Sequence, residues 1–139
     1  MACCNAYQLN SKELVSEAID TVIKHNINNC VIGIGFNCTH PKYINGLLQL
    51  TKECMQKQNN DFIVIVYPNS GEEWDAINKS WKPNTTMSDA TYAKCALSWF
   101  KNGANIIGGC CRTTPNTINT LKRTILSYIS DQSLLQSKL

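Results

Sequence analysis

The sequence lacks any apolar run close to the roughly 20 residues that a helix needs to cross a bilayer, so no transmembrane segment is expected. It also lacks a basic start followed by an apolar stretch, so it shows no export signal and is predicted to be cytoplasmic. No stripe of basic residues with interleaved aromatics is present, because the 13 basic and 10 acidic residues are scattered and the net charge is only +3. Nucleic acid is therefore not an expected partner.

Charged residues are few, at 17%, whereas hydrophobic residues make up 43% of the 139 residues. This composition and length predict one domain with a real core rather than a disordered chain. The eight cysteines are below the density of a small disulfide scaffold, and a reducing cytosol keeps thiols free. We therefore predict that the cysteines are thiols or metal ligands rather than disulfides.

Short apolar runs alternate with helical stretches along the chain. The apolar runs cover residues 2–7, 30–36, 62–67 and 104–108, and the run at 62–67 is apolar enough for a strand buried on both faces. Predicted helices begin with Ser11 as N-cap, at Pro41, after Ser88 or Asp89, and at Thr114-Pro115. Asn102-Gly103 ends the third helix, a polar loop spans 72–87, and residues 130–139 form a polar tail that we expect to fray.

This βαβαβαβα pattern predicts an α/β fold with a parallel sheet and right-handed crossovers. Four such units fit either a small doubly wound sheet or part of a (β/α)8 barrel, and the pattern alone does not choose between them. Both architectures place their active sites beyond the carboxyl ends of the strands.

Two of these strand ends carry three cysteines. Cys38 follows the second predicted strand, and Cys110 and Cys111 follow the fourth. Three thiolates are a known form of catalytic zinc site when the fourth position stays open. The alternative is that these cysteines are small buried hydrophobes. A vicinal pair on a regular strand would point to opposite faces, so a shared metal needs a bent strand end, which Gly108-Gly109 allows.

Other side chains are weaker candidates. His40 is expected to lie at a helix start rather than on a metal, and Glu72 and Glu73 either contact a cationic donor or are solvated. Trp74 and Trp81 could border a ligand pocket. Core packing is the expected role of the remaining cysteines, although Cys3 and Cys4 could instead be palmitoylated: Cys3, Cys4, Cys30, Cys54 and Cys95.

Taken together, the strand ends resemble the homocysteine S-methyltransferase family. The resemblance covers about residues 20–125, and its most specific string is Gly108-Gly109-Cys110-Cys111-Arg112-Thr113-Thr114-Pro115. Asn37-Cys38-Thr39 and Tyr67-Pro68-Asn69-Ser70-Gly71-Glu72 are similar to its other motifs. The resemblance implies a (β/α)8 TIM barrel and Zn²⁺ held by Cys38, Cys110 and Cys111. It also implies homocysteine thiolate as the methyl acceptor, with methionine as product, and a substrate-side role for Asn37.

The resemblance further implies a sulfonium methyl donor, S-methylmethionine or S-adenosylmethionine. A (β/α)8 barrel takes about 250 residues, so residues 1–129 are expected to be its (βα)4 C-terminal half. Activity would then need self-association or pairing with a full-length homologue. Two alternatives stay open: a truncated, catalytically inactive relative that binds zinc or such a homologue, and a zinc-binding module or membrane-anchored adaptor that uses Cys3 and Cys4.

Overall fold

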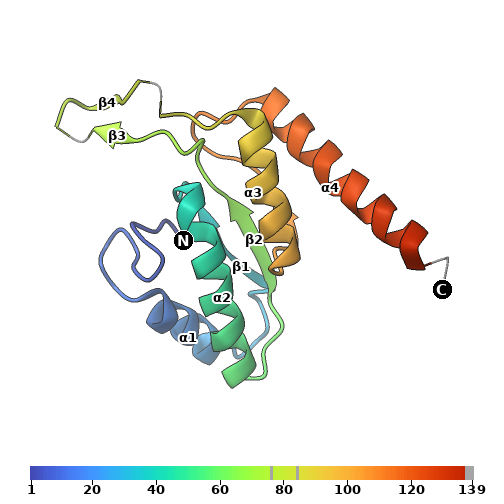
Figure 1. Cartoon of the computed structure of the whole chain (residues 1–139). Coiled ribbons are helices and arrows are strands. Elements are labelled where there is room, and N and C mark those ends of the chain that lie inside the picture. The colour runs from blue at the N-terminus through green and yellow to red at the C-terminus, as the bar shows by residue number, and fades with distance from the viewer. Residues whose placement is uncertain (76, 84, 137–139) are drawn as a thin grey trace.

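The computed structural model describes residues 1–75, 77–83 and 85–136. Within them the chain forms a parallel sheet with four helices, as predicted, and a small hairpin (Figure 1). The elements in chain order are α1 (Val15–His25), β1 (Gly33–Asn37), α2 (Pro41–Lys57), β2 (Ile63–Tyr67), β3 (Trp74–Asp75), β4 (Ser80–Trp81), α3 (Asp89–Lys101), β5 (Ile106–Ile107) and α4 (Pro115–Gln136).

The sheet has the order β1-β2-β5, and both pairings are parallel. Only one face of β2 is buried, because Val64 and Val66 are covered whereas Ile63 and Tyr67 are 40% and 41% exposed. The expectation that this strand is buried on both faces is therefore wrong for the chain alone. On the covered side the core is built from large side chains of the sheet and helices: Phe36, Ile44, Leu47, Val66, Tyr92 and Trp99.

Several helix boundaries follow the local signals in the sequence. Pro41 opens α2, and the preceding His40 caps it by accepting a hydrogen bond from the Lys42 backbone N–H. Ser88 caps α3, and Gly103 adopts a left-handed conformation (φ 97°) just beyond its end. The first helix differs, because α1 begins at Val15 rather than next to Ser11.

The first apolar run is not a strand. Residues 2–9 form a loop closed by an antiparallel bridge between Cys3 and Leu9. Asn5 explains the difference, since its Oδ1 accepts hydrogen bonds from the backbone N–H groups of Tyr7 and Gln8 and makes a turn. Met1, which precedes this loop, forms a backbone hydrogen bond to the sheet: its carbonyl accepts from the backbone N–H of Asn37, at the end of β1.

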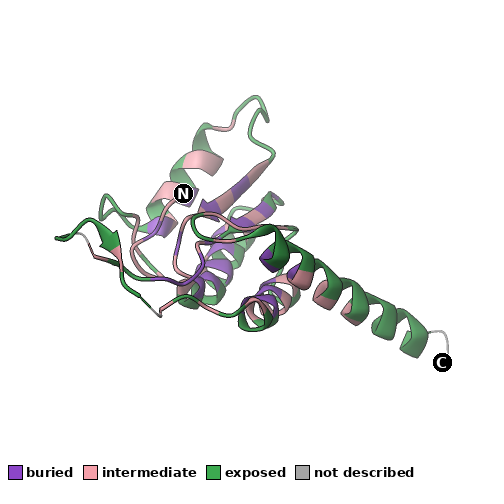
Figure 2. Ribbon diagram, turned by 90° about the horizontal axis from the view of Figure 1, so that it is seen from above, coloured by how far each residue is buried: buried purple, intermediate pink, exposed green. Residues whose placement is uncertain are grey.

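Two other segments are more ordered than the sequence suggests. The predicted loop at 72–87 contains the β3–β4 hairpin, in which the Trp74 and Trp81 rings lie edge to face with centroids 5.1 Å apart. Helix α4 continues to Gln136, past the start of the expected tail at residue 130. No glycine or proline lies between 130 and 136 to stop it, although this outer part of α4 is exposed (Figure 2). Residues 137–139 of that tail lie outside the described range.

Candidate metal centre

Three cysteine sulfurs converge at the carboxyl edge of the sheet. Cys38 directly follows β1, and Cys110 and Cys111 lie in the segment that joins β5 to α4. Their Sγ atoms all lie within 4.8 Å of one another, and they form the one cluster of potential metal ligands found among the described residues. The predicted convergence of two strand ends is therefore present, while the ligand role of each cysteine stays a prediction.

The structure joins Cys38 and Cys110 in a disulfide. The prediction that all the cysteines are thiols or metal ligands is thus wrong for this pair in this structure. The physical reason lies in the convergence itself, because the arrangement that gathers metal ligands also brings two sulfurs within bonding reach. The third sulfur, on Cys111, is free and lies 3.1 Å from Cys38 Sγ and 3.9 Å from Cys110 Sγ.

A sharp turn lets the vicinal cysteines face the same site. Strand β5 ends at Ile107, and the chain then folds so that the carbonyl of Cys110 accepts from both the backbone N–H and the hydroxyl of Thr113. A side chain at Gly109 would collide with Thr113, so the turn requires glycine at this position. This geometry is the bent strand end on which a shared site for Cys110 and Cys111 depends.

The turn after β1 also places its cysteine in an unusual backbone conformation. Cys38 has φ 49°, in the left-handed region that L-residues with a side chain seldom adopt. Its backbone N–H still donates to the carbonyl of Tyr67 at the end of β2, at 3.1 Å. The side chain is thereby turned out of the strand toward the two cysteines that follow β5.

An ion pair ties the segment after β2 to the cysteine segment. Arg112 Nε donates to Glu72 Oε2 at 2.6 Å, and its Nη2 donates to Oε1 at 3.3 Å. The guanidinium holds the pKa of the Glu72 carboxyl below its usual range. Glu72 is buried and both of its carboxylate oxygens accept from Arg112, while Glu73 forms an ion pair with Lys82. No motif in the sequence indicates that Glu72 and Arg112 pair across 40 positions.

A cavity of about 390 Å³ opens beside Cys38. The Trp74 and Trp81 side chains line it, so the predicted pocket border is present. His40 also faces it, but its Nδ1 already accepts from the Lys42 backbone, as expected for a residue at a helix start. Burial, followed by the charge of Lys42, lowers the pKa of the His40 imidazole. The full lining is Cys3, Cys4, Cys38, His40, Lys42, Tyr43, Asn69, Glu72, Glu73, Trp74 and Trp81.

The other predicted positions have mixed outcomes. Cys3 and Cys54 are buried and Cys95 is half-buried, in line with core packing, but Cys30 is exposed and does not pack. Cys30 lies in the chain between α1 and β1, where Val31 and Ile32 are exposed as well. Asn37 ends β1 and uses its backbone to contact Met1 and Thr39, so its substrate-side role stays a prediction.

The chain is similar to proteins of one family throughout most of its length. The model of the homocysteine S-methyltransferase family matches residues 1–125. Homocysteine S-methyltransferase 1 of Brassica oleracea var. italica is 41% identical over 113 residues, which cover 81% of this chain and 32% of that protein. Selenocysteine methyltransferase of Astragalus bisulcatus is 39% identical over 97 residues, covering 70% and 27%. The chain thus spans about a third of the length of these relatives.

Solved structures share the fold. The oxidised form of the homocysteine methyltransferase MmuM from Escherichia coli superposes with a TM-score of 0.59 at 24% identity, over 87% of this chain and 33% of that one. The metallated form gives a TM-score of 0.55 with the same identity and coverage. Among the described residues, no helix is both long and apolar enough to cross a membrane. The family match over residues 1–125 shows that this chain belongs to the homocysteine S-methyltransferase family.

Proposed function

We propose that reduced Cys38, Cys110 and Cys111 hold one zinc ion, and that the chain contributes this centre to methyl transfer from a sulfonium donor to homocysteine. The observation that carries the proposal is the convergence of three sulfurs within 4.8 Å at the carboxyl edge of a parallel sheet. Family membership supplies the reaction class, and the edge of the sheet is where such folds bind their substrates.

The donor set fits zinc. A tetrahedral ion with Zn–S bonds of about 2.3 Å sets its sulfurs about 3.8 Å apart. The Cys110 and Cys111 sulfurs, 3.9 Å apart, match this spacing, whereas the Cys38 and Cys111 sulfurs, 3.1 Å apart, are closer together in the disulfide-bonded structure. Reduction of the Cys38–Cys110 disulfide frees the two other ligands. Three thiolates would leave one coordination position of the zinc open. A substrate thiol that enters this position would have its pKa lowered by the zinc.

The reaction is balanced between two sulfur atoms. A carbon–sulfur bond forms between the donor methyl and the homocysteine thiolate while the methyl–sulfonium bond breaks. The electron pair of the broken bond stays on the donor sulfur, which becomes a neutral thioether, and methionine is the product. The thiol proton passes to solvent before the thiolate attacks. Trp74 and Trp81 border the cavity beside Cys38, and their ring faces suit the positive charge of a sulfonium donor.

We further propose that the chain forms the (βα)4 C-terminal half of a (β/α)8 barrel and needs a second copy or a full-length homologue to complete it. Its sheet leaves Ile63, Tyr67 and Ile106 at least 40% exposed, which is unusual for a parallel sheet. The open face also supports the alternative function, a truncated and inactive relative that binds zinc or associates with such a homologue.

Zinc content and methyl transfer, measured on the same preparation, separate these proposals. The chain would be purified under reducing conditions, its zinc counted, and homocysteine offered with S-methylmethionine or S-adenosylmethionine in turn. The Cys111→Ala variant is the control for adventitious metal. One zinc per chain with methionine formed supports the enzyme, and zinc without methionine supports the inactive relative. Absence of zinc from the reduced chain refutes the metal centre itself.

A further inference from the structure

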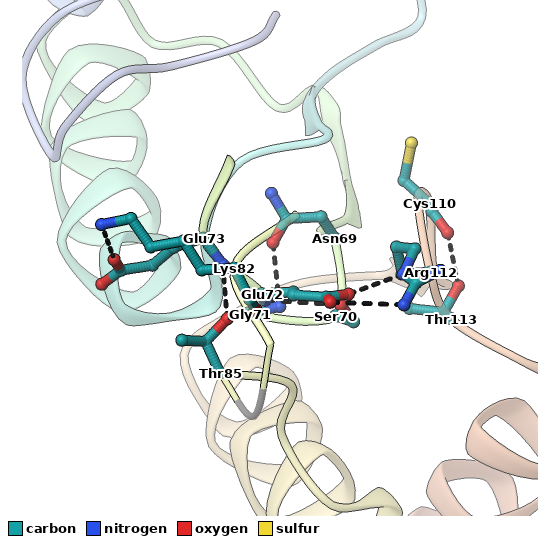
Figure 3. Close-up of polar contacts among 10 residues, drawn as sticks. All are labelled: Asn69, Ser70, Gly71, Glu72, Glu73, Lys82, Thr85, Cys110, Arg112 and Thr113. Carbon is teal, nitrogen blue, oxygen red and sulfur yellow. Dashed lines mark hydrogen bonds and ion pairs between the residues drawn. The ribbon is translucent and has the colours of Figure 1, made fainter. Parts of the chain in front are cut away.

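We propose that the 68–72 loop, which carries no cysteine, positions the zinc ligands, with Asn69 and Glu72 as its positioning residues. The inference rests on the proposed zinc site and adds to it a second layer of residues. The loop follows β2, the central strand, and therefore lies between the strand end that bears Cys38 and the one that bears Cys110 and Cys111. It contacts both sides, and Figure 3 shows its contact with Arg112 on the side of Cys110 and Cys111.

Asn69 holds the turn that carries Cys38. Its Nδ2 donates to the carbonyl of Cys38 at 3.0 Å, and its backbone N–H donates to the carbonyl of Thr39 at 3.2 Å. The Asn69 Oδ1 in turn accepts from the backbone N–H of Gly71 at 2.9 Å, so both ends of the amide are fixed. Because Cys38 has φ 49°, its conformation needs support from outside the turn. Asn69 supplies that support at the carbonyl.

Backbone bonds from the same loop hold the cysteine pair. The backbone N–H of Cys110 donates to the carbonyl of Pro68 at 2.8 Å, and the backbone N–H of Ser70 donates to the carbonyl of Cys111 at 3.0 Å. Each cysteine after β5 is therefore tied to a residue of the loop at its own peptide. The loop fixes where both Cα atoms lie relative to Cys38.

Glu72 completes the connection through Arg112, the residue after Cys111. The two hydrogen bonds between them, at 2.6 and 3.3 Å, use both carboxylate oxygens and fix the orientation of the guanidinium as well as its distance. Arg112 has φ 64°, so the backbone that leaves Cys111 is also held in an uncommon conformation. The Glu72 side chain is only 4% exposed. It influences the position of the cysteines through Arg112 and does not itself bind the substrate or the metal.

The neighbouring residue provides a matched comparison. Glu73 also forms an ion pair, with Lys82 at 2.9 Å, but both side chains are 52% exposed. Among the described residues, the hydrogen bonds of Glu73 and Lys82 run to each other and to Thr85 rather than to the cysteine segments. Loss of the Glu73 charge thus removes a carboxylate next to the 68–72 loop without breaking a contact to a cysteine segment. Glu72→Gln changes the ion pair with Arg112, the residue after Cys111, whereas Glu73→Gln leaves that ion pair intact.

The test measures zinc affinity on the full reduced chain by competition with a chromophoric chelator. We expect Glu72→Gln and Asn69→Ala to bind zinc about 10-fold to 100-fold more weakly than the wild type, as for other residues that orient metal ligands. Glu73→Gln is expected to match the wild type. Cobalt(II) in place of zinc gives a second readout, because displaced thiolates change its visible absorption bands.

Thermal unfolding of the metal-free chains, in chelator and reductant, separates positioning from folding. Glu72→Gln that unfolds like Glu73→Gln yet binds zinc more weakly supports the proposal. Should Glu72→Gln fail to fold, Glu72→Asp, which keeps the charge but shortens its reach, and Asn69→Ala decide the matter by the same titration. Wild-type affinity and an unchanged cobalt spectrum in the folded variants overturn the positioning role. A wild-type chain that binds no zinc overturns the metal centre first.

Discussion

Removal of single cysteines tests whether the three sulfurs act as one metal site. Alanine at Cys110 removes a sulfur that belongs both to the disulfide and to the proposed zinc site, whereas alanine at Cys111 removes one that belongs only to the zinc site. Each change should abolish tight zinc binding. Only the Cys110 change should also abolish the disulfide.

The size of the effect follows from the number of ligands. The free energy of zinc binding at structural sites is about 10–16 kcal/mol at neutral pH. Divided equally among four ligands, this is about 2.5–4 kcal/mol for each ligand. The loss of one thiolate should therefore weaken zinc binding by about 10²–10³-fold. Cys95→Ala is the matched control, because Cys95 is half-buried on α3 and is not part of the cluster.

Two assays on each variant give the answer. Chelator competition under reducing conditions gives the zinc affinity, and counting free thiols in the unfolded chain after mild oxidation gives the disulfide. We expect Cys111→Ala to lose zinc and keep the disulfide, Cys110→Ala to lose both, and Cys95→Ala to keep both. Undiminished zinc affinity in Cys110→Ala or in Cys111→Ala would refute the three-sulfur site.

Other changes test the frame around the site. Alanine at Gly35 would collide with the backbone of Ile65, so Gly35→Ala should lower the free energy of unfolding by about 1–3 kcal/mol in denaturant titrations, while Gly108→Ala, which meets only ordinary contacts, should cost far less. The single proton of the buried Tyr92 hydroxyl is shared between the carbonyls of Pro68 and Gly108, which follow two strand ends, so Tyr92→Phe should cost about 1–2 kcal/mol. Burial raises the pKa of Tyr92, so its contribution is complete below about pH 10 and is lost as the pH rises further, a loss that Tyr92→Phe should lack. The open face, where Ile106 is 52% exposed, should make the chain self-associate, and a monodisperse monomer in light scattering would contradict this.

The parts of the fold that sequence predicts well are those where local and overall signals agree. The run at 62–67 contains β2, the strand in the middle of the sheet, and Pro41, Ser88 and Gly103 mark helix boundaries as their chemistry requires. The segment at 2–7 misleads because an apolar run predicts burial but does not fix a conformation. There the side chain of Asn5 accepts hydrogen bonds from two backbone N–H groups, and these bonds stabilise a turn instead of a strand.

The end of α4 shows the opposite error. Polar composition after residue 130 suggests a frayed tail, yet composition alone does not stop a helix. The chain continues in the helix to Gln136, and the Ser133 hydroxyl is satisfied within it by the carbonyl of Ile129. Only a residue that disfavours helical backbone would have marked an earlier end.

For the site, topology predicts more than side-chain identity does. The alternating pattern predicts parallel strands, and parallel strands end at the same edge of a sheet. The sequence therefore predicts that Cys38 lies close to Cys110 and Cys111. The pattern does not distinguish a reduced cluster from a disulfide, because both need the same approach of sulfur atoms. The redox state of Cys38 and Cys110 depends on the surroundings of the protein, which the chain does not encode.

The charge of the site could not be derived from the sequence, because it depends on a contact between distant residues. Arg112 follows Cys111 directly, so a reading along the chain places a cation beside the thiolates. In the structure both carboxylate oxygens of Glu72 engage that guanidinium. In the proposed zinc site, three thiolates around Zn²⁺ would then keep a net negative charge, which would favour attack by a bound substrate sulfur on a cationic donor. An arginine released from Glu72 would oppose that charge, so in the proposed site the ion pair would affect reactivity as well as geometry.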